Sequence, residues 1–274
     1  MDMNREQELV ARARSGDRQA LVELLEEVKH PVYNLAIRML GSPADAEDAA
    51  QEILIRLVTN LDGFRGDSSF KTWVYRVAAN HLLKTRQRPG EALFGSFEAL
   101  AEYLDEGAND NRPTLDDALL LREAKLRCTS AMVLRLDREH RLAFILGEIL
   151  ELSSDDAAAA SGISTEAFRK RLSRARSRMA DFTLQTCGLV NQAVPCRCAK
   201  QATHAASQGR LDRGQVAWAK LPVLPEGQET LVTELDRLQA AVIALRSHPQ
   251  YAAPEALVQA IKQLVAPGRE GLLA

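Results

Sequence analysis

Apolar residues recur every three or four positions along most of this chain, which is the spacing of amphipathic α-helices. In the first third of the chain, this spacing predicts three helices, over residues 17–39, 43–60 and 69–87. Pro31 is expected to kink or restart the first of them, and Ser42 followed by Pro43 marks a capped start of the second. The alternation typical of β-strands is not found, so an all-α fold is expected.

The helical pattern fades after Arg88 and returns at Thr114. Glycine, proline and acidic residues accumulate between these positions, which predicts a flexible linker with a short helical turn near residues 97–103. A second helical unit follows, and a C-terminal extension closes the chain with two amphipathic helices near residues 229–247 and 254–265. The predicted units are residues 1–88, 89–113, 114–184 and 185–274.

The composition is that of a folded globular protein. The chain has 274 residues, 46% hydrophobic and 26% charged, enough for more than one core. Its net charge of -2 hides a segregation into acidic and basic blocks, so it does not argue against nucleic-acid binding. Neither an apolar run long enough for a membrane span nor a signal peptide is found, so a cytoplasmic protein without a membrane partner is expected. Its four cysteines are therefore expected to be reduced.

The stretch from Asp45 to Arg88 combines two kinds of helix that suit different partners. The first carries DAEDAAQE, an acidic face that either is solvated or meets a protein surface. The second begins FKTWVYRVAAN and interleaves aromatic with basic residues, a pattern that suits stacking of unpaired bases and contact with phosphates. Core packing is the alternative for each ring, and Phe70 and Trp73 fall on one helical face with Val74.

A second motif, SSDDAAAASGISTEAFRKRLSRARSRM, begins at Ser153. Gly162 allows a left-handed turn between two helices and Ser164 caps the second, which is the pattern of a helix-turn-helix. The basic residues of the second helix fit a major groove and its phosphates, and Phe168 and Leu172 are expected in the core. A solvated basic face is the alternative.

These motifs resemble the extracytoplasmic-function (ECF) sigma factors of bacterial RNA polymerase. DAED followed by QE, with FKTWVYRVAAN, resembles region two, and the helix-turn-helix after a linker resembles region four. The resemblance covers roughly residues 5 to 184 and implies a non-catalytic factor that binds core polymerase and promoter DNA. It places polymerase contacts on Asp45, Glu47, Asp48, Gln51 and Glu52. It places contacts with the −10 promoter element on Arg65, Ser69, Lys71, Trp73, Tyr75, Arg76 and Asn80. It places contacts with the −35 element on Ser164, Thr165, Glu166, Arg169, Lys170, Arg171 and Arg174.

One part departs from the family pattern. Family members read something like S-x-x-E-I-A at the first helix of the turn, where this chain reads SSDDAA from Ser153. Ala157 in place of a bulky aliphatic residue is expected to leave this helix underpacked, dependent on its neighbours and modest in −35 affinity. A stand-alone helix-turn-helix regulator of duplex DNA is the alternative function. The chain shows neither a phosphate loop nor a nucleophile with its base, which argues against an enzyme.

The extension carries Cys187, Cys196 and Cys198, followed by His204. These four form a legitimate ligand set for zinc or another thiophilic metal, although their spacing is not that of a standard zinc finger. Inert reduced thiols, or a redox pair between Cys187 and one of the other two, are the alternatives. Cys128 lies on a predicted helix and is expected to be a small core residue.

Some ECF groups carry C-terminal extensions that regulate the sigma domains, and this extension resembles one. It is expected to pack against region two or region four and to respond to metal or thiol state, with a stabilising appendage as the alternative. Such a regulator within the chain makes a separate anti-sigma factor less necessary. The sigma function itself is expected to require no cofactor.

Overall fold

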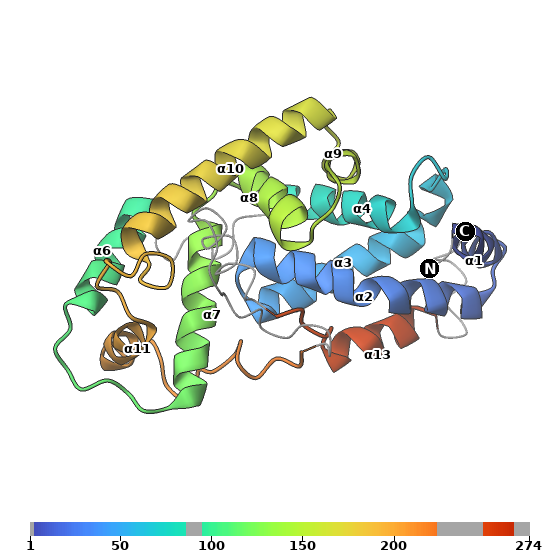
Figure 1. Cartoon of the computed structure of the whole chain (residues 1–274). Helices are drawn as coiled ribbons and strands as arrows, with labels where there is room; N and C mark the ends of the chain where they lie inside the picture. Colours follow the sequence, from blue (N-terminus) through green and yellow to red (C-terminus); the bar gives the residue numbers. More distant parts are fainter. Residues whose placement is uncertain (1–2, 86–94, 224–248, 266–274) are drawn as a thin grey trace.

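The computed structural model describes residues 3–85, 95–223 and 249–265 (Figure 1). Its helices and helical turns are α1 (Met3–Arg14), α2 (Arg18–Leu40), α3 (Pro43–Thr59), η1 (Leu61–Gly63), α4 (Phe70–Lys84), α6 (Phe97–Ala108), α7 (Ala118–Leu134), α8 (Arg138–Phe144), the π-helical turn η2 (Ile145–Ile149), α9 (Ser154–Ser161), α10 (Thr165–Thr186), α11 (Cys198–Ser207) and α13 (Glu255–Leu264). Within the described ranges, extended pairing is limited to one bridge between Val223 and Tyr251, so the all-α prediction is confirmed. The helix predicted at residues 229–247 lies outside these ranges.

Helices α1 to α4 form an N-terminal bundle whose ends are set by local signals. Asp17 caps α2 by accepting hydrogen bonds from two backbone amides, and Gly41 ends it in the left-handed conformation, with φ 70°. The hydroxyls of Ser42 and Ser69 cap α3 and α4. Pro31 lies inside α2, which continues past it, so the predicted restart is wrong. Buried apolar residues on both sides of the proline hold the helix against its neighbours, offsetting the lost backbone hydrogen bond.

Helices α8 to α10 form the predicted helix-turn-helix unit. Gly162 makes its turn in the left-handed conformation, with φ 67°, and the Ser164 hydroxyl caps α10. Helix α9 packs against α4 of the N-terminal bundle (Figure 1). Ala157, Ala158 and Ala160 are buried in this unit, and side chains this small allow two helices to approach closely. The neighbour on which α9 depends is therefore α4.

The segment predicted to be a flexible linker contains a packed helix. Helix α6 begins at a Ser96 cap, and its Leu100, Leu104 and Ala108 are buried. It packs against α7, α10 and α11, while its acidic residues face solvent. The acidic composition that suggested a linker is the exposed face of an amphipathic helix. The helical turn predicted near residues 97–103 is therefore too short, because α6 continues to Ala108.

The C-terminal extension packs against the N-terminal bundle and against α6 and α7. Helix α11 lies against α6 and α7, and α13 lies against α2 and α3. Before α13, the Asn34 side chain donates to the carbonyl of Tyr251 at 2.7 Å and accepts from its amide at 2.8 Å. Arg38 donates to the carbonyl of Pro249 at 3.0 Å, and the amide of Ala253 donates to His30 Nδ1 at 2.8 Å. We call these contacts, between α2 and the backbone of residues 249–253, the tail clamp.

Candidate nucleic-acid interface

Helix α3 presents an acidic surface. The five residues predicted to contact the polymerase all reach solvent, with the last three exposed: Asp45, Glu47, Asp48, Gln51 and Glu52. The N-cap of α3 places Asp45 in the first turn, where the helix dipole favours negative charge. The predicted residues therefore share one accessible face of one helix. Its use as a polymerase contact stays a prediction.

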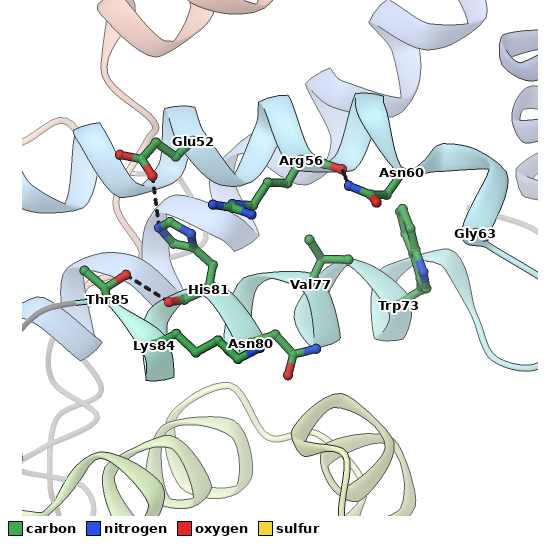
Figure 2. A pocket seen from close by; sticks show the side chains of 10 residues that line it. All are labelled: Glu52, Arg56, Asn60, Gly63, Trp73, Val77, Asn80, His81, Lys84 and Thr85. Carbon is green, nitrogen blue, oxygen red and sulfur yellow. Dashed lines mark hydrogen bonds and ion pairs between the residues drawn. The ribbon is translucent and has the colours of Figure 1, made fainter. Parts of the chain in front are cut away.

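An open groove of about 590 Å³ runs between α3 and α4 (Figure 2). Helix α3 and the turn after it contribute Glu52, Arg56, Asn60 and Gly63. Helix α4 and the residue that follows it contribute Trp73, Val77, Asn80, His81, Lys84 and Thr85. The α4 residues lie three or four positions apart, so one face of that helix lines the groove.

The groove combines the kinds of group that an unpaired nucleic-acid strand binds. Trp73 is partly exposed and offers a ring on which a base can stack. Arg56 and Lys84 supply positive charge for phosphates, and Asn80 supplies an amide that both donates and accepts hydrogen bonds. Of the seven residues predicted to contact the −10 element, Trp73 and Asn80 meet in this groove.

Trp73 is held in place by two other rings. Phe64 and Phe70 are buried, with centroids 5.5 Å apart, and they lie 5.7 and 5.6 Å from Trp73. Tyr75 is also buried in the bundle, and burial raises its pKa to about 12. In this arrangement Tyr75 is a core residue instead of the predicted −10 contact, because the phase of α4 turns its ring inward.

The remaining residues predicted for the −10 element lie outside the groove. Arg65, Lys71 and Arg76 are exposed. The Ser69 hydroxyl caps α4 by accepting from the amide of Thr72 at 3.1 Å, so its role in the fold is local. The three cations remain available to contact phosphates beside the groove.

Three polar groove residues had no predicted DNA role: Arg56, Asn60 and His81. Helical spacing from Trp73 contained the signal for His81, because it lies on the same side of α4. Arg56 and Asn60, on α3 and at its C-cap, depend on how α3 packs against α4, which spacing alone does not give. Across the groove, His81 Nε2 lies 3.7 Å from a carboxylate oxygen of Glu52.

Helix α10 presents the second predicted DNA surface. Arg169 and Arg174 are exposed, and neither forms an ion pair within the described ranges. Lys170 is also exposed and pairs with Glu166 one turn earlier, at 2.6 Å. An exposed pair of this kind is weak, so Lys170 can exchange its partner for a phosphate.

The other residues predicted for the −35 element have partners in the fold. Arg171 pairs with Glu139 of α8 at 2.9 Å. The Ser164 hydroxyl caps α10, and Thr165 donates to Asp155 of α9 at 2.8 Å. These bonds set the geometry of the turn, while the arginines farther along α10 face solvent.

A family model for sigma-70 region 2 matches residues 24–89, which include both walls of the groove. RNA polymerase sigma-H factor of Pseudomonas aeruginosa is 30% identical over 189 residues, which is 68% of this chain and 96% of that protein. ECF RNA polymerase sigma-E factor of Escherichia coli is 32% identical over 175 residues, which is 62% of this chain and 90% of that protein. This chain belongs to the ECF sigma factors.

As a sigma factor, the protein is a transcription initiation factor whose partners are core RNA polymerase and promoter DNA. Among solved structures, it is similar to the sigma factor RpoE of Bartonella quintana in complex with the anti-sigma factor NepR. That likeness covers 58% of this chain and 92% of that chain, at 23% identity and a TM-score of 0.41. In the described ranges of this sigma factor, none of the helices is both long and apolar enough to cross a membrane.

The two DNA-binding units of this sigma factor are packed against each other. Thr72 of α4 donates to a carboxylate oxygen of Asp156 on α9, at 3.0 Å. Arg138 of α8 donates to carbonyl oxygens at the end of α4, and Arg141 donates to the carbonyl of Met39 on α2 at 2.6 Å. Helix α4 is therefore enclosed between α3 and the helix-turn-helix unit (Figure 1).

The four residues predicted as metal ligands of the sigma factor do not meet. His204 Nδ1 lies 3.2 Å from Asp110, and its Nε2 lies 3.0 Å from the Gln208 amide. Its three predicted cysteine partners surround a different pocket. In the described part of the chain, no three His, Cys, Asp or Glu side chains are placed to hold a metal ion. The ligand set that includes His204 is therefore not assembled, and metal binding by the extension stays a prediction.

Proposed function

We propose that this sigma factor directs core polymerase to promoters through three surfaces. The acidic face of α3 binds the polymerase, the groove between α3 and α4 holds unpaired bases of the −10 element, and the exposed face of α10 binds the −35 duplex. RNA synthesis belongs to the polymerase, so the chain contributes positioning and base recognition without catalytic residues. It works in the cytoplasm, where polymerase and promoters meet.

The observation that carries this proposal is the position of Trp73. Its ring belongs to a cluster with two buried phenylalanines, yet it stays partly exposed in a groove with Arg56, Lys84 and Asn80. An accessible indole beside cations suits a base that stacks on it while its phosphates meet the positive charges. A regulator that binds duplex DNA alone has no use for such a groove.

The two DNA-binding helices, α4 and α10, lie closer together than binding to both promoter elements at once requires. We call this the closed arrangement. The −10 and −35 elements are about 25 base-pair steps apart, which is roughly 85 Å at about 3.4 Å per step. Helix α4 contacts α9, and α9 packs against α10, so the two DNA-binding helices are near neighbours. They cannot occupy both elements until the α4–α9 contact opens. Promoter binding therefore separates the two units.

The C-terminal extension braces the closed arrangement from both sides. Helix α11 holds α6 and α7, and the tail clamp holds α2. The two parts of the extension meet where the amide of Ala252 donates to the carbonyl of Pro222, at 2.8 Å. Burial lowers the pKa of Arg38 in the clamp to about 10, and the charge it keeps at neutral pH is satisfied by carbonyl oxygens. The extension thus acts as a regulator within the chain that opposes opening, and a separate anti-sigma factor is not required for that role.

Run-off transcription with bacterial core polymerase tests the proposal. The full chain is compared with Asn34→Ala, which removes both hydrogen bonds to the Tyr251 backbone. We expect both proteins to initiate from defined start sites, with a higher yield for Asn34→Ala at limiting sigma factor, because its brace is weakened. Gln259→Ala, an exposed change on α13, is the matched control and should behave as the unmodified chain.

The two parts of the proposal fail in different ways. If the full chain neither binds core polymerase nor initiates, the sigma assignment of these surfaces fails and a duplex-binding regulator becomes the better account. If initiation occurs but Asn34→Ala and the unmodified chain give equal yields, the sigma function stands and the brace is refuted.

A further inference from the structure

Four cysteines from separate parts of the chain surround one small pocket. Cys128 lies on α7, Cys187 ends α10, and Cys196 and Cys198 come from the loop before α11 and its first residue. The pocket has a volume of about 20 Å³, room for about one water-sized particle. Cys128, expected to be a core residue, stands where the sequence had suggested His204.

The four thiols lie close enough to affect one another's ionisation. Burial, followed by the charges of the other three cysteines, raises the pKa of Cys128. Burial, followed by Cys187 and Cys196, raises the pKa of Cys198 to about 11, and burial followed by Cys187 raises that of Cys196. Each thiol therefore lies near the other three, in agreement with the pocket that all four line.

The pocket also contains groups that favour sulfur in its thiolate form. Gln201 Nε2 lies 3.4 Å from the sulfur of Cys196, and the backbone amide of Gly188 also donates to this sulfur. Cys198 begins α11, and a helix N-terminus favours negative charge. A Cβ at Gly188 would lie 2.1 Å from the carbonyl oxygen of Cys196, so a glycine is needed for the turn after Cys187 to approach this closely.

We propose that Cys128, Cys187, Cys196 and Cys198 form a binding site for one thiophilic cation, with Zn²⁺ as the ion that fits. Tetrahedral coordination by four cysteines is a common structural zinc site. As placed, the four cysteines line the pocket but do not yet form a ligand sphere. Binding releases four thiol protons to solvent, and side-chain rotation brings each sulfur to about 2.3 Å from the ion.

A disulfide is the competing chemistry for these residues. A disulfide would consume two sulfurs and leave the other two unchanged. A cation engages all four at once, which matches their shared position around one pocket better.

The ion would fasten the −35 helix to the extension. Cys187 ends α10, Cys128 sits midway along α7, and Cys198 begins α11, so one ion joins three helices. It shares no residue with the tail clamp, which contacts α2. The inference is independent of the sigma function, because metal binding is measured without polymerase or DNA.

Spectroscopic titration with Co²⁺ tests the proposal on the full chain. The reduced, chelator-treated protein should bind one Co²⁺ per chain and show sulfur-to-cobalt charge transfer with the intense d–d bands of a tetrahedral thiolate site. One equivalent of Zn²⁺ should displace the Co²⁺ and protect all four thiols together from alkylation. Absence of Co²⁺ binding, an octahedral spectrum, or protection of fewer than four thiols would overturn the four-thiol site.

Two variants separate this site from the ligand set suggested by the sequence. Cys128→Ser should weaken Co²⁺ binding by more than about tenfold, since changes beyond the ligands themselves already have effects of that size. His204→Gln should leave affinity and spectrum unchanged, and the reverse result would overturn the assignment. Cys128→Ala, with helicity checked by circular dichroism, distinguishes a lost ligand from a lost fold. A disulfide among these cysteines in the unreduced protein, with Co²⁺ binding absent after reduction, would favour the redox alternative.

Discussion

The two helices assigned to DNA differ in how far they are embedded in the molecule. Helix α4 packs between α3 and α9, so the side chains proposed to bind DNA alternate with core residues along it. Helix α10 buries one face and leaves Arg169 and Arg174 on the other. The difference means that changes on α4 affect both fold and DNA binding, whereas the exposed arginines of α10 can be removed without disturbing the core.

Tyr75→Ala is expected to have the largest effect. Tyr75 is buried in the core, so truncation should lower the free energy of unfolding by about 3–5 kcal/mol, the usual cost of removing a buried aromatic ring. Denaturant unfolding followed by circular dichroism measures the loss. Tyr75→Phe keeps the ring and should retain both stability and promoter melting. A Tyr75→Phe variant that is stable yet fails to melt promoters would restore Tyr75 as a −10 contact.

Trp73→Ala tests the open side of the same helix. If an unpaired base stacks on this ring, its loss should weaken binding of single-stranded −10 DNA, with polymerase present, by about 1–3 kcal/mol. Fluorescence anisotropy with a labelled oligonucleotide gives the value. Val77→Ala removes an apolar neighbour in the same groove without removing a stacking surface, and should change affinity much less. Equal losses for the two variants would mean that the groove binds DNA without stacking on Trp73.

Sequence patterns predicted the starts of helices better than the contacts between them. Spacing and caps were enough to predict the helices that begin after Ser42, Ser69 and Ser164, because those signals are local. The inward turn of Tyr75 and the gathering of Cys128 with three distant cysteines depend on packing between elements. Composition around α6 was misleading for a related reason, since its acidic face dominates the segment while a short apolar face fixes it to its neighbours.

The double variant Arg169→Ala, Arg174→Ala tests the exposed helix. Each phosphate contact removed should reduce the slope of log affinity against log salt by about 0.9, while the free energy of unfolding stays within about 0.5 kcal/mol. Salt titrations of binding to −35 duplex DNA measure the slope. Lys170→Ala is the control, because Lys170 already has Glu166 as a partner, and a smaller change is expected. An unchanged slope in the double variant would remove α10 from the DNA interface.

Thr72→Val should loosen the contact that encloses α4. It removes the hydrogen bond to Asp156, which is worth about 0.5–1.5 kcal/mol, and the exposed carboxylate regains water as a partner. It also removes the contact between the Thr72 and Ser69 hydroxyls, at 2.9 Å. We expect slightly lower stability but tighter binding to promoter DNA, because the closed arrangement competes less. Thr59→Val, which removes a hydrogen bond within α3, is the control. Weaker promoter binding by Thr72→Val would show that the α4–α9 contact does not oppose DNA binding.

The smallest expected effect is a dependence of the tail clamp on pH. This clamp holds the C-terminal extension against α2 of the N-terminal bundle. Burial, followed by the charge of Lys29, lowers the pKa of His30, while Glu26 acts in the opposite direction. The neutral ring accepts a hydrogen bond from the amide of Ala253, which the protonated ring cannot do. The pKa of His30 in the folded chain lies below the unfolded value of about 6.5. Between these two pKa values, the unfolded chain binds more protons than the folded chain. The stabilisation is therefore present above pH 6.5 and is lost as the pH falls through the lowered folded pKa.

Unfolding free energies between neutral and mildly acidic pH measure this loss, and His30→Gln is the matched variant. Its amide oxygen can accept a hydrogen bond but does not titrate, so its stability should fall less on acidification than that of the unmodified chain. If the clamp opposes opening, acidification should also raise promoter binding in the unmodified chain more than in His30→Gln. Parallel pH profiles for the two proteins would show that His30 does not control the clamp, and would leave Asn34 and Arg38 as the contacts that hold the extension on α2.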